Sequence, residues 1–200
     1  MPLLFILAPV VVRVFNDNPE VVAYVLEIVR FWMDLDGDGD YGDGIDGFRC
    51  DVAGFVPVDF WSTVRAELDA IRPVFMLAEL ETRDLHAEAF DMTYAWSWYE
   101  TVHRIAMGRA DAGALGIYHY TDENSWPPGG MRMLFVSNHD KNAWEGTQFE
   151  AFGPALENAI VLSVASRGIP LIYNGQEAGN PKRLAFFERD PIEWRDHRLG

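Results

Sequence analysis

Three acidic residues each follow an apolar, strand-like segment, and their types and spacing could support acid–base chemistry. They are Asp51 after residues 47–50, Glu79 after 74–78, and Asp140 after 135–139. Taken alone, each is better explained as a helix cap or as a salt-bridged residue at a sheet edge. Because the carboxyl ends of parallel strands meet at one edge of a sheet, three such acids predict a shared cleft.

The neighbourhood of Asp51 indicates which chemistry this cleft would perform. Arg49 lies two residues before Asp51, so both side chains leave the strand on the same side. A guanidinium there would keep Asp51 ionised, as a nucleophile requires. A pair of carboxyls, one acting as acid and the other as nucleophile or base, fits glycoside hydrolysis, and a separation of about 5 Å would give a retaining double displacement.

These acids need a parallel sheet, and the chain has the matching alternation of strands and helices. Strands are predicted near residues 44–52, 74–78, 90–96, 131–137 and 170–173. Helices are predicted at 19–32, 57–71, 97–107, 111–120 and 154–168. Strands that alternate with helices are typical of an α/β protein with a parallel sheet. No linker interrupts residues 1–200, so we expect a single domain.

Charge and composition narrow the function classes. A formal net charge of −15 argues against nucleic acid as a partner and against an anionic membrane surface. The single cysteine, Cys50, cannot form an internal disulfide. The apolar start of the chain is too short to span a bilayer, and a buried strand and a signal peptide both remain open for it. The compartment therefore stays unassigned.

Four segments resemble, in order, conserved motifs of the α-amylase family of glycoside hydrolases (glycoside hydrolase family 13). They are Gly-Phe-Arg-Cys-Asp at 47–51, Met-Leu-Ala-Glu at 76–79, Ser-Asn-His-Asp at 137–140, and Gly-Ile-Pro-Leu-Ile-Tyr-Asn-Gly-Gln-Glu at 168–177. Asn16 to Val21 is similar to the lead-in of the helix before the family's fourth strand. The resemblance runs from about residue 15 to 194.

The resemblance implies a role for each matched residue. Asp51 would be the nucleophile, Glu79 the general acid/base, and Asp140 the residue that holds sugar hydroxyls and stabilises the transition state. Arg49, His139 and Asn138 would support substrate binding. Further candidates are aromatic side chains for which both sugar stacking and ordinary packing remain open: Tyr94, Trp96 and Trp144.

The family fold is an eight-stranded (β/α) barrel of about 250 residues or more. The match begins at the helix before strand four, so we expect a partial TIM barrel of roughly strands four to eight. The first three strands, the B domain and the C-terminal β domain have no counterpart in the matched motifs. An open sheet edge of this kind favours pairing with a second copy, which predicts a homo-oligomer.

An Asp/Gly-rich loop precedes the first motif. Asp34, Asp36, Asp38 and Asp40 alternate with other residues as in calcium loops. Position twelve of that register is Ile45 instead of the bidentate Glu of an EF-hand, which argues against an EF-hand. A Ca²⁺ site and a merely solvated acidic loop both remain open.

The resemblance therefore implies a retaining hydrolase, an α-amylase-type glycosidase, that acts on α-1,4-glucans such as starch and maltooligosaccharides. Two alternatives stay open. The chain could be a catalytically impaired remnant that binds carbohydrate or a partner. It could also be a transglycosylase of the same family, because the chemistry shares the same motifs.

Overall fold

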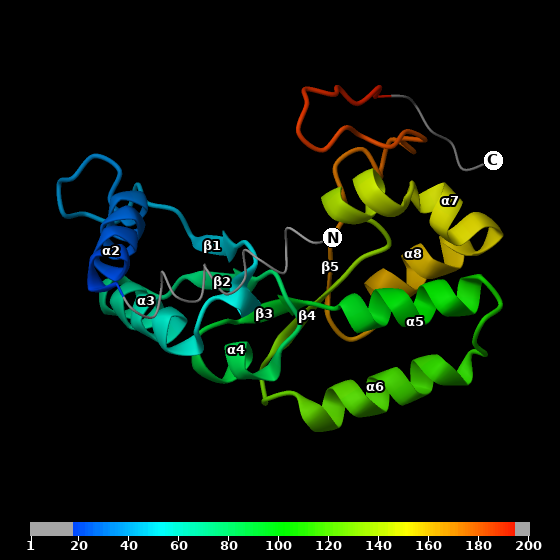
Figure 1. Cartoon of the computed structure of the whole chain (residues 1–200), viewed down its shortest axis with the longest axis horizontal. Helices are drawn as coiled ribbons and strands as arrows, with labels where there is room; N and C mark the ends of the chain where they lie inside the picture. Colours follow the sequence, from blue (N-terminus) through cyan, green and yellow to red (C-terminus); the bar gives the residue numbers. More distant parts are fainter. Residues whose placement is uncertain (1–17, 195–200) are drawn as a thin grey trace. The chain divides into compact units, whose positions relative to one another are not determined.

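The computed structural model describes residues 18–194 of the 200-residue chain. The chain divides into two compact units, whose elements are labelled in Figure 1. The first unit comprises residues up to Tyr94 together with Trp126–Met131, and the second comprises Ala95–Ser125 and the residues from Arg132 onward. The apolar start of the sequence, for which a strand or a signal peptide was considered, lies outside the described residues.

The first unit is a layer of parallel strands with helices packed on it. Its elements are α2 (Pro19–Met33), β1 (Gly47–Cys50), the 3₁₀ turn η1 (Ala53–Phe55), α3 (Val58–Ile71), β2 (Phe75–Ala78), α4 (Arg83–Glu88) and β3 (Met92–Tyr94). β1 pairs with β2 in parallel, Gly47 opposite Phe75, and β2 pairs with β3, Leu77 opposite Met92. The parallel register brings the carboxyl ends of the strands to one edge.

Local sequence explains where the helices of this unit begin and which face they bury. Asn18 caps α2 by accepting the Glu20 backbone N–H at 3.0 Å, and Pro19 occupies the first helical position. α2 and α3 then pack their apolar faces on the strands. The core includes Met33, Val64, Leu68 and Met76, of which Met33, Leu68 and Met76 have no exposed surface.

The second unit contains α5 (Trp96–Ala106), α6 (Gly113–Ser125), β4 (Met131–Leu134), the π-helical turn η2 (Lys141–Glu145), α7 (Gln148–Phe152), the 3₁₀ turn η3 (Gly153–Ala155), α8 (Leu156–Ala165) and β5 (Ile169–Pro170). β4 pairs with β5 in parallel, with Met133 opposite Ile169. Its core is aromatic: Trp98, Tyr99, Phe135 and Phe152 are fully buried. Burying such large rings supplies much of this unit's apolar stabilisation.

The predicted strands and helices are present, and the strands are shorter than predicted. The sheet pairing of the last two strands stops at Leu134 and Pro170, so the residues beyond them serve as loops that carry side chains. The short helices α4 and α7, of 6 and 5 residues, were not predicted, because a helix of this length does not establish an apolar period. Thr147 and Glu150 form a capping box that is a usable sequence signal for α7.

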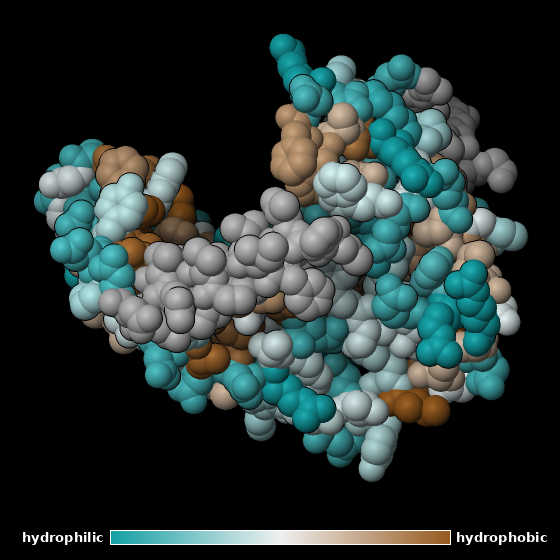
Figure 2. Space-filling model, viewed as in Figure 1, coloured by the Kyte–Doolittle hydropathy of each residue, from teal (hydrophilic) through white to brown (hydrophobic). Residues whose placement is uncertain are grey.

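The β1 side of the first unit carries apolar surface. α2 exposes Tyr24, Phe31 and Trp32, and Figure 2 shows brown side chains over this helix. A cavity of about 470 Å³ lies between α2, α3 and β1 and is lined by residues such as Val25, Trp32 and Phe48. Within residues 18–194, β1 pairs with β2 alone.

No helix in that range has both the length and the apolarity that crossing a bilayer requires.

The contact between β1 and β2 predicts that Gly47→Ala destabilises the fold. A Cβ at Gly47 would lie 2.3 Å from the Phe75 carbonyl oxygen on the neighbouring strand, so the two backbones would have to separate. We expect a loss of about 1–3 kcal/mol in the free energy of unfolding, measured by urea denaturation. Gly116→Ala is the matched control. Its Cβ meets open space in α6, so stability should hold or rise by up to about 1 kcal/mol. Equal midpoints for Gly47→Ala and the wild type would contradict the prediction.

Candidate active site

In the first unit, one guanidinium holds two of the predicted catalytic carboxyls. Arg49 Nη2 lies 2.8 Å from Glu79 Oε1, and Arg49 Nη1 pairs with Asp51 Oδ1. Arg49 and Asp51 leave the end of β1 on the same side, and Glu79 follows the last residue of β2. Parallel pairing of Cys50 with Ala78 brings these strand ends into line. The structure therefore brings Arg49, Asp51 and Glu79 together.

The residue after Asp51 adopts a strained backbone that completes this arrangement. Val52 has φ 45° and ψ 32°, in the left-handed region that β-branched residues avoid. In this conformation its N–H donates to Glu79 Oε2 at 2.8 Å. Such strain costs on the order of 1–3 kcal/mol and is found mostly at functional sites. Val52 thus ends β1 and orients the Glu79 carboxyl through its backbone.

The two carboxyls have opposite environments. The side chain of Glu79 is 12% exposed, whereas that of Asp51 is 69% exposed. Burial raises the pKa of Glu79, and the adjacent Asp51 adds to the rise, while the Val52 N–H and Arg49 oppose it. The net direction is upward. Glu79 therefore keeps its proton to a higher pH than an ordinary glutamate, as a general acid must, while Asp51 is solvated and paired with a cation.

Tyr94 lies beneath the Arg49 guanidinium. The Arg49 Cζ is 5.8 Å from the centroid of the Tyr94 ring, and the ring is buried. Burial lowers the pKa of Arg49, but its hydrogen bonds with Tyr94 and Asp51 and the nearby charge of Glu79 outweigh this, so the pKa is raised overall. Tyr94 thus holds Arg49 in place. Its predicted role as a sugar-stacking ring stays a prediction.

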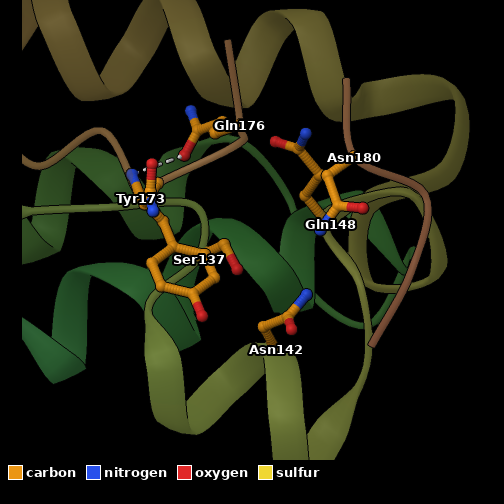
Figure 3. Close-up of a pocket in the computed structure, with 7 residues that line it drawn as sticks. Ser137, Asn142, Gln148, Tyr173, Gln176 and Asn180 are labelled. Atoms are coloured by element: carbon orange, nitrogen blue, oxygen red, sulfur yellow. Dashed lines mark hydrogen bonds between the residues drawn. The ribbon is translucent and has the colours of Figure 1, made fainter. Parts of the chain in front are cut away.

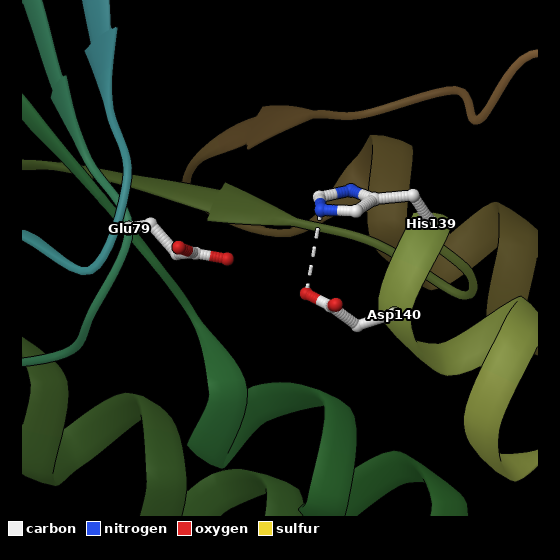
Figure 4. A group of neighbouring side chains, drawn as sticks. All are labelled: Glu79, His139 and Asp140. Carbon is white, nitrogen blue, oxygen red and sulfur yellow. Dashed lines mark ion pairs between the residues drawn. The ribbon is translucent and has the colours of Figure 1, made fainter. Parts of the chain in front are cut away.

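In the second unit, His139 and Asp140 lie beyond β4. His139 Nε2 is 3.5 Å from Asp140 Oδ2, as the dashed line in Figure 4 marks; the figure also draws Glu79, which belongs to the first unit. Asn138, predicted to contact substrate, is fully buried, and its Oδ1 accepts the Lys141 backbone N–H at 2.8 Å. This bond shapes the chain that presents His139 and Asp140.

Lys141 is a buried cation that the sequence reasoning did not assign to the site. Its Nζ lies 2.7 Å and 2.9 Å from the two carboxylate oxygens of Glu145, and 3.2 Å from Glu100. The same ammonium is 4.4 Å from the centroid of the Tyr99 ring. A buried charge needs such partners. Lys141 therefore ties the π-helical turn η2, directly after Asp140, to α5.

The two predicted tryptophans differ in exposure. Trp96 is half-buried and packs edge-on against Phe135, with ring centroids 5.1 Å apart. Trp144 is 62% exposed and lies 5.2 Å from Phe186, also measured between centroids. Of the two, Trp144 is the ring that offers a face to a ligand.

A small polar pocket lies behind the segment that carries His139 and Asp140 (Figure 3). Its lining consists of hydroxyl and amide side chains: Ser137, Asn142, Gln148, Tyr173, Asn174, Gln176 and Asn180. Its volume, about 10 Å³, is close to that of a single water probe. Ser137 Oγ and Gln148 Oε1 are buried here without a protein partner. The pocket was not predicted from the sequence.

The acidic loop after α2 gathers part of the predicted calcium set. Carboxylate oxygens of Asp34, Asp36 and Asp43 lie within 4.8 Å of one another. Asp38 and Asp40 lie outside this cluster, and they accept the backbone N–H of Asp40 and Gly42, at 2.7 Å and 3.1 Å. Three hard oxygen donors fit a Ca²⁺ ion. Asp43 was not among the residues predicted for this site.

Comparison with known proteins gives relatives along most of the chain. An α-amylase of Haloarcula japonica is 31% identical over 189 residues, which cover 92% of this chain and 26% of the relative. Neopullulanase 2 of Thermoactinomyces vulgaris is 26% identical over 195 residues, which cover 94% of this chain and 32% of the relative. The crystal structure of an α-amylase from Lactobacillus plantarum superposes with a TM-score of 0.73 at 27% identity, covering 86% of this chain and 42% of that one.

The chain belongs to the α-amylase family of glycoside hydrolases. The resemblance seen in the sequence motifs is thereby confirmed, as is the fold class, a partial (β/α)₈ barrel. The chain spans about a quarter to a third of the length of the two curated relatives described above. No family model matches it.

The raised pKa of Glu79 predicts a pH effect on stability. The folded protein holds the Glu79 proton above the ordinary value of 4.5, so it binds more protons than the unfolded chain in the window above that pH. Stability must therefore fall as the pH rises through the folded pKa. Chemical denaturation across pH 4 to 8 should show this loss in the wild type and not in Glu79→Gln. Parallel pH profiles for the two proteins would contradict the assignment.

Calcium binding by the acidic loop stays a prediction. Isothermal titration of the chain with CaCl₂ should show one site, which Asp36→Asn together with Asp43→Asn removes. The control is Asp111→Asn, outside the loop, whose Oδ1 accepts the Gly113 N–H at 2.8 Å. No heat at millimolar Ca²⁺ would leave the acidic loop as a solvated turn.

Proposed function

We propose that this chain carries the catalytic carboxyls of a retaining glycosidase that acts on α-1,4-glucans. The observation that carries the proposal is the pair of carboxyls bound to one guanidinium in opposite environments, Glu79 buried with a raised pKa and Asp51 exposed. Two carboxyl groups, one kept protonated and one ionised, are what a retaining glycosidase requires. Membership of the α-amylase family supports the substrate class.

In the proposed first step, an oxygen of Asp51 attacks the anomeric carbon and forms a covalent glycosyl-enzyme. The glycosidic C–O bond breaks, and the leaving oxygen takes the proton of Glu79. In the second step, the Glu79 carboxylate accepts a proton from water. The water oxygen displaces Asp51 from the anomeric carbon, and both carboxyls return to their starting states.

Arg49 has two roles in this scheme. It pairs with Asp51, and a cation in contact favours the ionised carboxylate that a nucleophile requires. It also orients the Glu79 carboxyl, whose pKa stays raised. The role proposed for Asp140, holding sugar hydroxyls with help from His139, rests on its place in the family motif. The 3.5 Å contact between His139 Nε2 and Asp140 Oδ2 supports it by orienting the Asp140 carboxylate.

Transglycosylation uses the same residues, with a sugar hydroxyl in place of water in the second step. Product analysis separates the two reactions, because transfer lengthens some oligosaccharides while hydrolysis only shortens them. A binding remnant would bind maltooligosaccharide without turnover. Self-association through the β1 edge stays a prediction.

The test is reducing-sugar release from maltoheptaose by the whole chain and its variants. Asp51→Asn should lower the rate by about a thousand-fold or more, because it removes the nucleophile. Glu79→Gln should lower it by about 10²–10⁴-fold.

Asp69→Asn is the control for this assay. Asp69 pairs with Arg65 on the surface of α3, and its loss should leave the rate unchanged. If the wild type unfolds cooperatively and yet releases no sugar, the hydrolase proposal fails and the binding remnant takes its place.

A further inference from the structure

Four rings gather beside Asp140 in the second unit, and two of them come from a segment to which the sequence reasoning assigned no role. Phe186 lies at the centre: its ring centroid is 5.7 Å from that of His139, 5.2 Å from that of Trp144 and 4.7 Å from that of Phe187. We call Trp144, Phe186 and Phe187, together with the His139 imidazole, the aromatic platform.

The platform is exposed to a degree unusual for such rings. Trp144 is 62% and Phe187 is 82% exposed. Isolated apolar side chains on a surface need no explanation, but contiguous ones mark a binding surface. Phe186 and Phe187 meet at an interplanar angle of 79°, so the platform offers a corner with two aromatic faces.

The platform is also held rigidly, by contacts on both of its segments. Asn142 Oδ1 accepts the Leu184 N–H at 2.7 Å, and Asn142 Nδ2 donates to the Lys182 carbonyl at 3.2 Å. These bonds tie the segment that bears Phe186 and Phe187 to the turn η2 that bears Trp144. Arg183 adds a two-pronged contact to Glu150, at 3.0 Å and 3.1 Å.

A second set of contacts fixes the chain around the two phenylalanines. Lys182 pairs with Asp190, and the other Asp190 oxygen accepts the Ala185 N–H at 3.0 Å. Glu150 accepts hydrogen bonds from Arg183 and, with a smaller effect, from the Thr147 backbone, and these lower its pKa to about 2. The Glu150–Arg183 pair that holds this segment therefore stays charged. Rings presented in one fixed arrangement lose little conformational entropy when a ligand packs on them.

The chemistry at the edge of the platform indicates the ligand. The Asp140 carboxylate lies 3.5 Å from His139 Nε2, and the His139 ring is tilted by 30° over Phe186. A glucosyl ring has an apolar C–H face and a rim of hydroxyls. The aromatic corner suits that face, and the carboxylate and imidazole beside it suit the rim. A wholly apolar partner would cover the Asp140 carboxylate without replacing the water that now reaches it, which is costly.

We propose that Trp144 and Phe187, supported by Phe186, form a sugar-binding subsite that stacks a glucosyl unit of an α-glucan next to the residue held by Asp140. This inference rests on the proposed function for the identity of the sugar. The subsite adds contacts to a further glucosyl unit beside the one that Asp140 holds. Longer maltooligosaccharides therefore bind more tightly than maltose.

The test is isothermal titration of the full chain with maltoheptaose and with maltose, beside hydrolysis kinetics on maltoheptaose. Phe187→Ala and Trp144→Ala should each weaken maltoheptaose binding by roughly three- to tenfold, the effect of losing one aromatic contact. They should raise KM by a similar factor with little change in kcat. Trp144→Phe keeps a ring and should retain most of the affinity.

Tyr120→Ala is the control, because Tyr120 is an exposed ring on α6 outside the platform, and it should bind as the wild type does. Each variant must show the wild-type unfolding midpoint.

The outcomes separate the two proposals. Unchanged affinity in both alanine variants, or a wild type that folds and does not bind maltoheptaose, overturns the subsite. If the wild type binds maltoheptaose without hydrolysing it, and the alanine variants bind it more weakly, the subsite is supported. That result refutes only the hydrolase proposal.

Discussion

The ion pairs of Arg49 with Asp51 and Glu79 are the interaction on which the candidate active site depends. A guanidinium presents donors in a rigid fork, so one side chain can orient two carboxyls at once. Neighbouring carboxylates repel each other, and the shared cation makes their proximity tolerable. The parallel pairing of β1 with β2 supplies the geometry, because it sets the ends of both strands side by side.

In the second unit, a buried ammonium group orients the chain that carries the polar side chains. Lys141 lies among Glu100, Glu145 and the Tyr99 ring, and it holds the turn that follows Asp140. Asn142, one residue later, binds the backbone of the segment that carries the exposed phenylalanines. A short run of sequence thereby positions a carboxylate, an imidazole and three aromatic rings. In both units, polar contacts behind the site orient the groups at its surface.

Residue type and strand position together specify the chemistry of the acids at the ends of β1 and β2. Asp51, Glu79 and Arg49 follow or end apolar strands, and the structure brings them together as the spacing predicted. Tyr94 and Asn138 are buried, and their predicted roles in sugar binding stay predictions. An aromatic ring or an amide has the same appearance in a sequence whether it binds a ligand or fills the interior.

The sequence by itself determined the family, the parallel α/β class and the identity of the candidate catalytic acids, since these depend on local pattern and motif order. Only the tertiary structure decided the strained Val52 backbone, the raised pKa of Glu79, the replacement of Asp38 and Asp40 by Asp43 in the acidic cluster, and the aromatic platform. Those properties arise from burial and from contacts between residues far apart in the chain. Trp144 and Phe187 are separated by more than forty positions, and no local pattern indicates that their rings meet.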